Sequence, residues 1–334
     1  MDCKSHISNL KFQISDFRFL FQILEFKYRV RFQMELIERI QQIKTVRNAV
    51  ILAHNYQIGP VQDIADYTGD SLGLSIQASK TDADVIVFCG VHFMAETAAI
   101  LSPDKAVLLP EKTAGCPMAD MINAEQLAEM KAKHPDALVV TYVNSTAEVK
   151  AMSDYCCTSG NAVELVASLP KDREILFVPD QNLGAFVMER TGRKMILWPG
   201  YCPTHVWIEP EAVEAMRKEH PGAVVLAHPE CTPAVRAISD ELLSTGQMLK
   251  FVPKSDAKTF IIATEIGIVH TLKKMYPDRE FVPVSNRAVC PNMKKISLEK
   301  ILWSLEDMEY RIAVPEDIAA KARLSLERMI EIVP

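Results

Sequence analysis

The sequence has no long apolar run and no basic cluster. No apolar run reaches 18 residues, although 49% of the 334 residues are hydrophobic, so we expect no membrane-spanning helix. Lysine and arginine form no dense block and the formal net charge is -6, so the chain lacks the positive surface that binds a phosphate backbone. These absences argue against membrane and nucleic-acid partners.

Motifs built from closely spaced residues are also absent. The chain has no G-x-G-x-x-G or Walker loop, so a nucleotide cofactor has no support. It lacks the C-x2-C pairs of structural zinc sites and the three-cysteine motif of radical S-adenosylmethionine enzymes. The eight cysteines are unevenly spaced and no secretory signal is visible, which predicts a reducing, cytoplasmic location and no disulfide framework.

Residues 1–33 differ in composition from the rest of the chain. They hold six of the thirteen phenylalanines, interleaved with lysine and arginine. We interpret them as an extension outside the fold, upstream of a natural start at Met34, where "MELIERIQQIK" begins a helical pattern. An amphipathic membrane-surface helix and a transit peptide are the alternatives, and the acidic residues Asp2, Asp16 and Glu25 argue against the transit peptide.

The chain contains a repeated Cys-Pro pair. Cys116, Cys202 and Cys290 each precede a proline, and they are 86 and 88 residues apart. This spacing indicates an internal repeat of about 87 residues. The repeat predicts three units, followed by C-terminal helices that pack on the first unit: 34–118, 119–205, 206–296 and 297–334.

Other residues recur in the same register. An apolar run ends 62, 60 and 62 residues before the three cysteines, at His54, Tyr142 and His228. A hydroxyl follows each of these residues by 17 positions, at an expected helix start: Ser71, Ser159 and Thr245. A serine there is usually only a helix cap, and a single strand-end histidine is usually a core residue. Their recurrence in all three units favours a shared site.

The apolar runs predict the fold class. They are four to seven residues long, rich in valine and isoleucine, and separated by helical patterns, which is typical of strands buried in parallel sheets. We therefore expect an α/β protein of three α/β/α units with small parallel sheets, related by a pseudo-threefold axis. Because ligands bind outside the carboxyl ends of parallel strands, the repeated polar residues and cysteines should meet in one central cavity.

Three cysteines that share a cavity suit a metal centre. A cysteine at a helix start, followed by proline, faces the positive end of the helix dipole, which should lower the thiol pKa. A zinc ion held by the three cysteines and His205 is one candidate, and a [4Fe-4S] cluster with one open iron is another. Packing without a metal is the third reading. Cys231 has no counterpart in the other units, so we leave it out of the set.

Ten motifs, in order from Met34 to the end of the chain, resemble those of the quinolinate synthase family. They are "AHNYQ", "GDSLGLS", "GVHFMAETA", "GCPMAD", "YVNS", "PGYCPTH", "HPEC", "STGQM", "ATEIG" and "CPNMK". The resemblance implies a [4Fe-4S] cluster held by Cys116, Cys202 and Cys290, whose open iron acts as a Lewis acid.

The resemblance also implies an activity. Members of the family condense iminoaspartate (iminosuccinate) with dihydroxyacetone phosphate to quinolinate, releasing phosphate and water, in de novo NAD biosynthesis. An L-aspartate oxidase or an aspartate dehydrogenase would then be a functional partner that supplies iminoaspartate. A cluster-dependent hydro-lyase acting on a dicarboxylate and a non-enzymatic iron-sulfur sensor are the alternatives. The many convergent polar residues weigh against a sensor.

Matching the motifs position by position implies the site residues. Tyr56 corresponds to the catalytic tyrosine of the family, and Tyr56, His228 and Glu230 are the groups that we expect to transfer protons. His228 and Glu230 leave one strand end two residues apart, so their side chains should point to the same side. The implied substrate contacts are His54, Ser71, Tyr142, Val143, Asn144, Ser159, His228, Pro229, Glu230 and Thr245.

Overall fold

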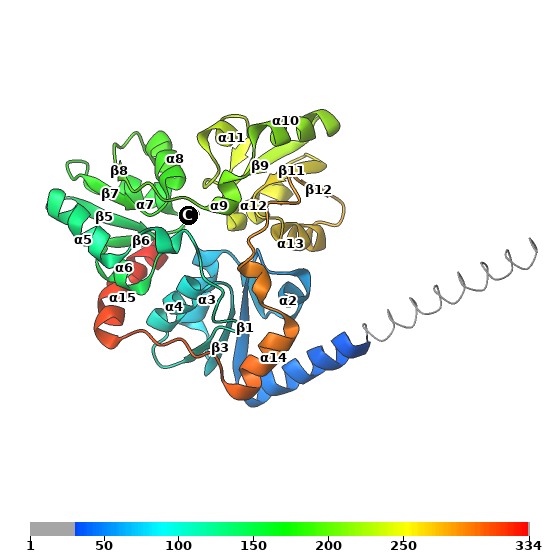
Figure 1. Cartoon of the computed structure of the whole chain (residues 1–334). Helices are drawn as coiled ribbons and strands as arrows, with labels where there is room; N and C mark the ends of the chain where they lie inside the picture. The colour runs from blue at the N-terminus through cyan, green and yellow to red at the C-terminus, as the bar shows by residue number, and fades with distance from the viewer. Residues whose placement is uncertain (1–30, 333–334) are drawn as a thin grey trace, which may run out of the picture.

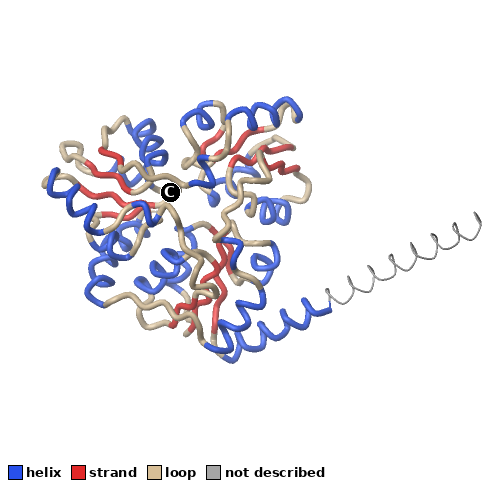
Figure 2. Tube along the Cα trace, viewed as in Figure 1, coloured by secondary structure: helices blue, strands red, loops and turns tan. Residues whose placement is uncertain are grey.

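The computed structural model describes residues 31–332, and these form three α/β units around a common centre (Figure 1). Each unit contains one sheet of four parallel strands, flanked by helices (Figure 2). The predicted fold class is confirmed. Every helix within the described residues is too short or too polar to traverse a bilayer.

The first unit alternates short apolar strands with helices. Four of the six residues of its first strand and all five of its third are buried, as expected for a parallel sheet with both faces covered. After a helix over residues 31–46, its elements are β1 (Ala49–His54), α2 (Gly59–Ile64), β2 (Tyr67–Gly69), α3 (Ser71–Lys80), β3 (Val85–Cys89), α4 (His92–Leu101) and β4 (Ala106–Leu108).

The second unit repeats this order after a short 3-10 helix, η1 (Ala119–Met121). Its first helix has a complete capping box, in which Asn123 and Gln126 bond each other's backbone N–H groups. The elements are α5 (Ala124–Lys133), β5 (Leu138–Tyr142), α6 (Ala147–Ala151), β6 (Tyr155–Cys157), α7 (Ala162–Ser168), β7 (Ile175–Val178), α8 (Gln181–Thr191), β8 (Ile196–Leu197) and α9 (Pro203–Val206).

The third unit follows the same plan, and two further helices end the described chain. Its elements are α10 (Pro210–Glu219), β9 (Val224–Ala227), α11 (Pro233–Ala237), β10 (Glu241–Leu242), α12 (Thr245–Phe251), η2 (Val252–Lys254), β11 (Thr259–Ala263), α13 (Ile268–Met275), β12 (Glu280–Pro283) and η3 (Met293–Lys295). The last helices are α14 (Leu298–Asp307) and α15 (Glu316–Glu331).

The three sheets share one strand order. It is β2-β1-β3-β4 in the first unit, β6-β5-β7-β8 in the second and β10-β9-β11-β12 in the third. The order reverses between the two central strands, and a crevice forms at the carboxyl ends of strands at such a point. The short edge strands β2, β6 and β10 were not predicted, because two or three residues are too few to show a hydrophobic pattern.

An aspartate recurs in each unit at the amino-terminal part of the sheet, opposite the carboxyl ends of its strands. Asp66, Asp154 and Asp240 each accept a hydrogen bond from the backbone N–H of a first-strand residue fifteen positions earlier, at 2.8, 2.8 and 2.7 Å. The three units thus share a tie between their edge strand and their first strand, in addition to their strand order.

Residues at the beginning of the described chain pack on its end. The helix over residues 31–46 includes the three residues before Met34, and the first buried side chain among the described residues is Leu36. Arg39 pairs with Glu306 of α14 at 3.3 Å. Of the predicted N-terminal extension, residues 1–30 lie outside the described residues.

The terminal helices differ from the prediction that both pack on the first unit. α14 does lie there, against β3. α15 instead lies across the first two units, against α4 of the first and α6 and β6 of the second. Arg323 donates to the backbone oxygen of Ile100 at 2.9 Å, and Ser325 donates to that of Lys150 at 3.0 Å. The apolar face of α15 therefore joins two units.

We predict that Glu111→Gln lowers the free energy of unfolding by about 1 kcal/mol at neutral pH. The Glu111 carboxylate accepts from the Lys300 ammonium of α14 at 2.6 Å, and from the backbone and hydroxyl of Thr113. These bonds lower the pKa of Glu111 from 4.5 to about 2.

Because the folded pKa lies below the unfolded one, this stabilisation is complete above pH 4.5 and is lost as the pH falls through about 2. Urea unfolding of the parent and the variant measures the difference in stability. The difference should narrow as the pH is lowered below 4.5, and a constant difference would contradict the assignment.

Candidate functional site

The first strands of all three units point their carboxyl ends at one pocket in the centre of the molecule. His54 ends β1, Tyr142 ends β5 and His228 directly follows β9. All three side chains line this central pocket, whose space amounts to about 690 Å³ when its solvent-open part is included. The repeat detected in the sequence therefore corresponds to three equivalent strand ends around one space.

Most of the predicted site residues line the central pocket. Besides the three strand-end residues they are Tyr56, Ser71, Cys116, Asn144, Ser159, Cys202, Glu230, Thr245 and Cys290. Val143 and Pro229 do not line it. Both are buried, and Val143 is part of the hydrophobic core. Alternate side chains of an extended stretch point to opposite sides. Val143 and Pro229 therefore point away from the pocket, and the residues on either side of each line it.

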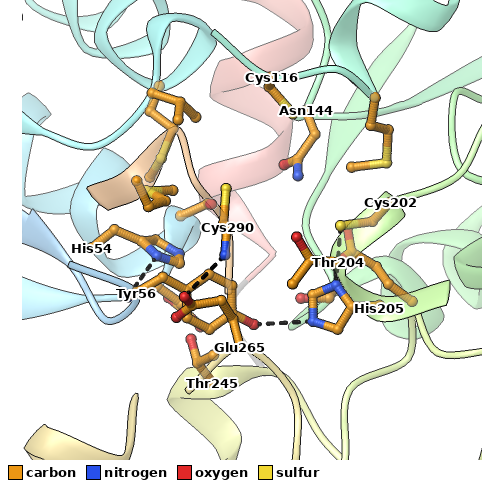
Figure 3. Close-up of a pocket in the computed structure, with 18 of the residues that line it drawn as sticks. His54, Tyr56, Cys116, Asn144, Cys202, Thr204, His205, Thr245, Glu265 and Cys290 are labelled. Carbon is orange, nitrogen blue, oxygen red and sulfur yellow. Dashed lines mark hydrogen bonds and ion pairs between the residues drawn. The ribbon is translucent and has the colours of Figure 1, made fainter. Parts of the chain in front are cut away.

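Cys116, Cys202 and Cys290 reach the pocket on three different segments of the chain (Figure 3). In each case the backbone N–H of the residue three positions later acts to lower the pKa of the thiol. Only Cys202 has the predicted place at the start of an α-helix, as the N-cap of α9. The other two precede the short 3-10 helices η1 and η3.

The prediction of lowered thiol pKa values is wrong for the protein without a metal. Burial raises the pKa of Cys116 to about 12, and it also raises the pKa values of Cys202 and Cys290. The backbone N–H groups act in the opposite direction but are outweighed, since a buried thiolate loses its hydration. Negative charge on a neighbouring sulfur adds to the shift, from Cys290 on Cys116 and from Cys116 on Cys202.

Three thiolates would therefore be stable here only beside positive charge. The pocket has room for a positively charged group, since a Cβ added to Gly115, next to Cys116, would meet no atom within 4 Å. Soft sulfur donors and free space fit an iron-sulfur or zinc centre. The residues present thus fit a metal centre.

A line of hydrogen bonds connects Tyr56 to Glu230. The Tyr56 hydroxyl lies 2.6 Å from the hydroxyl of Thr264, which lies 2.8 Å from Nε2 of His205. Nδ1 of His205 lies 2.9 Å from the Glu230 carboxylate. A His205 ring with its proton on Nδ1 can donate to Glu230 and accept from Thr264, so this line can carry a proton between the two ends.

Glu230 is an acid of the pocket that contacts two histidines. Burial alone would raise its pKa, but His205 and His228, at 2.9 and 3.3 Å, outweigh burial and lower it. Its other carboxylate oxygen is buried without a hydrogen-bond partner. Burial and the nearby charge of Glu230 raise the pKa of Tyr56 well above its usual value. At neutral pH the pocket therefore offers a carboxylate and a protonated phenol.

Comparison with known proteins agrees with this arrangement. A model of the family described as quinolinate synthetase A protein matches residues 38–331. A quinolinate synthase of Dehalococcoides mccartyi (strain CBDB1) is 58% identical over 300 residues, which is 90% of this chain and 99% of the relative. The chain belongs to the quinolinate synthase family. The family and the prediction of an enzyme are confirmed.

Other quinolinate synthases are similar over nearly their whole length. That of Geobacter metallireducens is 56% identical over 295 residues, which is 88% of this chain and 97% of the relative. Quinolinate synthase 2 of Methanosarcina acetivorans is 55% identical over 297 residues, which is 89% of this chain and 96% of the relative. The described fold thus contains almost all of the sequence that is shared within the quinolinate synthase family.

The pocket also offers neutral hydrogen-bond donors. Burial lowers the pKa of His54 to about 3, so this ring is neutral at physiological pH. The backbone N–H of Tyr56 donates to Nδ1 of His54 at 3.1 Å, which places the ring proton on Nε2. Nε2 of His228 lies 3.1 Å from the hydroxyl of Ser159. This arrangement suits the anionic groups of a small quinolinate synthase substrate.

Several residues of the site were not predicted from the sequence. Asp70, Thr204 and Glu265 line the pocket. Thr264 does not line it but connects Tyr56 to His205 in the line of hydrogen bonds. His205 was predicted only as a possible zinc ligand. Thr264 and Glu265 follow the strand β11, so applying the strand-end rule to the middle strands, as well as to the first ones, would have found them.

One compact group could hold a single metal ion. The ligand atoms of Cys202, His205 and Glu230 lie within 4.8 Å of one another, and among residues 31–332 no other set of three such side chains is as compact. The zinc set predicted from the sequence, three cysteines with His205, is therefore more widely spaced than this group.

Proposed function

We propose that this chain condenses iminoaspartate with dihydroxyacetone phosphate to quinolinate, in de novo NAD biosynthesis. The reaction releases phosphate and two waters and forms one carbon-carbon and one carbon-nitrogen link of the ring. The observation that carries the proposal is the central pocket. In it, three thiols, a paired carboxylate and hydroxyls from all three units share one space.

Cys116, Cys202 and Cys290 would hold a [4Fe-4S] cluster. Thiolates are the usual ligands of such clusters, and ligands of different irons need not be as compact as those of one ion. Three ligands leave one iron open, which supplies a Lewis acid for a hydroxyl that departs as water. The wider spacing of the cysteines, compared with the Cys202, His205 and Glu230 group, supports the cluster over a zinc ion.

The substrates would bind through hydroxyls and neutral rings. Ser71 and Thr245 are the first residues of α3 and α12, and Ser159 follows β6, so donors from three units surround one anionic group. His54 donates from its neutral ring. The other substrate contacts in this proposal are Tyr142, Asn144, His228 and Glu230, whereas Val143 and Pro229, which do not line the pocket, position these neighbours.

Glu230 would act as the general base and Tyr56 as a general acid. Enolisation, imine formation and dehydration each need a proton moved, and the line through Thr264 and His205 joins these two residues. His228 contacts the same oxygen of the Glu230 carboxylate as His205 does and helps to orient it. Protons removed by Glu230 can thus return through Tyr56 without bulk water.

The supply of substrate follows from its chemistry. Iminoaspartate is an oxidation product of aspartate, so an L-aspartate oxidase or an aspartate dehydrogenase would be the functional partner. We further propose that the protein acts in the cytoplasm, where thiols stay reduced. The seven cysteines within the described residues are all unpaired, which supports that location.

An anaerobic assay with both substrates tests the proposal. We expect quinolinate and phosphate to appear in equal amounts, and neither to appear when one substrate is omitted. Loss of water from a dicarboxylate without phosphate release would indicate the hydro-lyase instead. A protein that carries a cluster but turns over no substrate would indicate a sensor.

A further inference from the structure

Equivalent positions directly after the middle strands carry different residues in the three units. The second residue after β3 is Val91, whereas Asp180 and Glu265 are the second residues after β7 and β11. Both carboxylates are fully buried. A buried carboxylate needs hydrogen-bond donors or a positive charge, so its partners indicate its purpose.

Asp180 holds the loop that carries Cys202. One carboxylate oxygen accepts from the backbone N–H of Cys202 at 3.1 Å, and the other accepts from that of Leu183 at 2.7 Å, which caps α8. The backbones of Asp180 and Gly200 also form a parallel bridge. A Cβ on Gly200 would lie 2.4 Å from the backbone oxygen of Pro179, so only glycine allows this approach.

Glu265 holds the Cys290 loop in the same way (Figure 3). Its Oε1 accepts from the backbone N–H of Cys290 at 3.1 Å and from the Lys294 ammonium at 2.8 Å. Its Oε2 accepts from the backbone N–H of Gly267 at 2.7 Å. Lys294 also donates to the backbone oxygen of Tyr56. Glu265 therefore connects the Cys290 loop to the segment that carries Tyr56.

We propose that Asp180 and Glu265 are positioning residues for the metal centre, each fixing the peptide of one ligand cysteine. The proposal rests on the proposed cluster. Groups that orient metal ligands commonly change metal affinity by about 10- to 100-fold when they are removed. In the first unit, where Val91 stands at this position, no carboxylate among the described residues accepts from the backbone N–H of Cys116. A buried carboxylate therefore holds the peptide N–H of two of the three ligand cysteines, and Cys116 lacks this contact.

The variants Asp180→Asn and Glu265→Gln test this role. An amide has one acceptor oxygen where a carboxylate has two, so at least one N–H group loses its partner while size is kept. The readout is the half-time of iron loss from the reconstituted full chain to a chelator, measured anaerobically from the cluster absorption. We expect iron loss about tenfold faster in each variant than in the parent.

Asp154→Asn is the matched control. Asp154 also accepts a backbone N–H of a strand at 2.8 Å, but it lies at the opposite end of the sheet from the cysteines. It should release iron at the parental rate. If Asp154→Asn also lost iron faster, the cause would be a general loosening of the fold, and the proposal would be overturned. Parental rates of iron loss in both test variants would overturn it too.

The outcomes separate this inference from the proposed function. A parent chain that takes up no iron would overturn the cluster and the inference together. A parent chain with a stable cluster, whose variants lose iron no faster, would overturn only the inference. If Asp180→Asn fails to fold because α8 loses its cap, Glu265→Gln, which caps no helix, decides the question.

Discussion

Alanine at Cys290 should abolish bound iron and quinolinate formation together. Three sulfurs share the central pocket, and two of them would leave a second iron of the cluster without a protein ligand. The same result is expected for Cys116→Ala and Cys202→Ala. Iron and sulfide analysis of anaerobically reconstituted protein measures the first effect, and the two-substrate assay measures the second.

Cys231→Ala is the strictest control for this prediction. Cys231 is adjacent to Glu230 in sequence and is fully buried, but its thiol donates to the backbone oxygen of Ala263 and does not line the pocket. Cys89→Ala and Cys157→Ala, in strands, are further controls. All three variants should keep their iron. A full complement of iron in Cys290→Ala would remove Cys290 from the ligand set.

The second large effect is expected for Glu230→Gln, which should lower kcat by about 10²-fold or more while substrate still binds. The amide keeps the size of the side chain and its contact with His205, but it cannot take up a proton. Because the two histidines keep the Glu230 pKa low, the parent is ionised throughout the neutral range and the variant has no equivalent base.

Single-turnover quinolinate formation and substrate titration of the cluster spectrum separate chemistry from binding. Glu111→Gln, whose carboxylate lies outside the pocket, should turn over at the parental rate. Near-normal single-turnover rates in Glu230→Gln would exclude Glu230 as the base and would leave His205 or His228 in that role.

Repetition made much of the architecture predictable. One cysteine in a pocket has many explanations, whereas three in the same register, each following a strand-end residue at nearly constant distance, predict a shared centre. The parallel sheets followed from continuous apolar runs such as Val85–Cys89, which is buried at every position. The edge strands were missed because Glu241–Leu242, for example, is only two residues long.

The line of hydrogen bonds from Tyr56 to Glu230 could not be predicted from the sequence, because it depends on contacts between units. Thr264 belongs to the third unit, His205 to the second and Tyr56 to the first, and no sequence spacing shows that they meet within hydrogen-bonding distance. The direction of the thiol pKa shifts was wrong for a related reason. Sequence suggested the local helix dipole, but the amount of burial depends on how all three units close around the pocket.

The carboxylates that tie each edge strand to its sheet bear on how this protein arose. Asp66, Asp154 and Asp240 are the same residue in all three units, whereas the equivalent strand-end residues His54, Tyr142 and His228 are not all alike. A scaffold tripled from one ancestral segment would start with three identical walls around the pocket, whereas a ligand without threefold symmetry meets each wall with different atoms. Selection could therefore change the residues at the strand ends in one unit at a time. The aspartate at the amino-terminal part of each sheet would stay the same, because its carboxylate bonds a backbone N–H of its own unit.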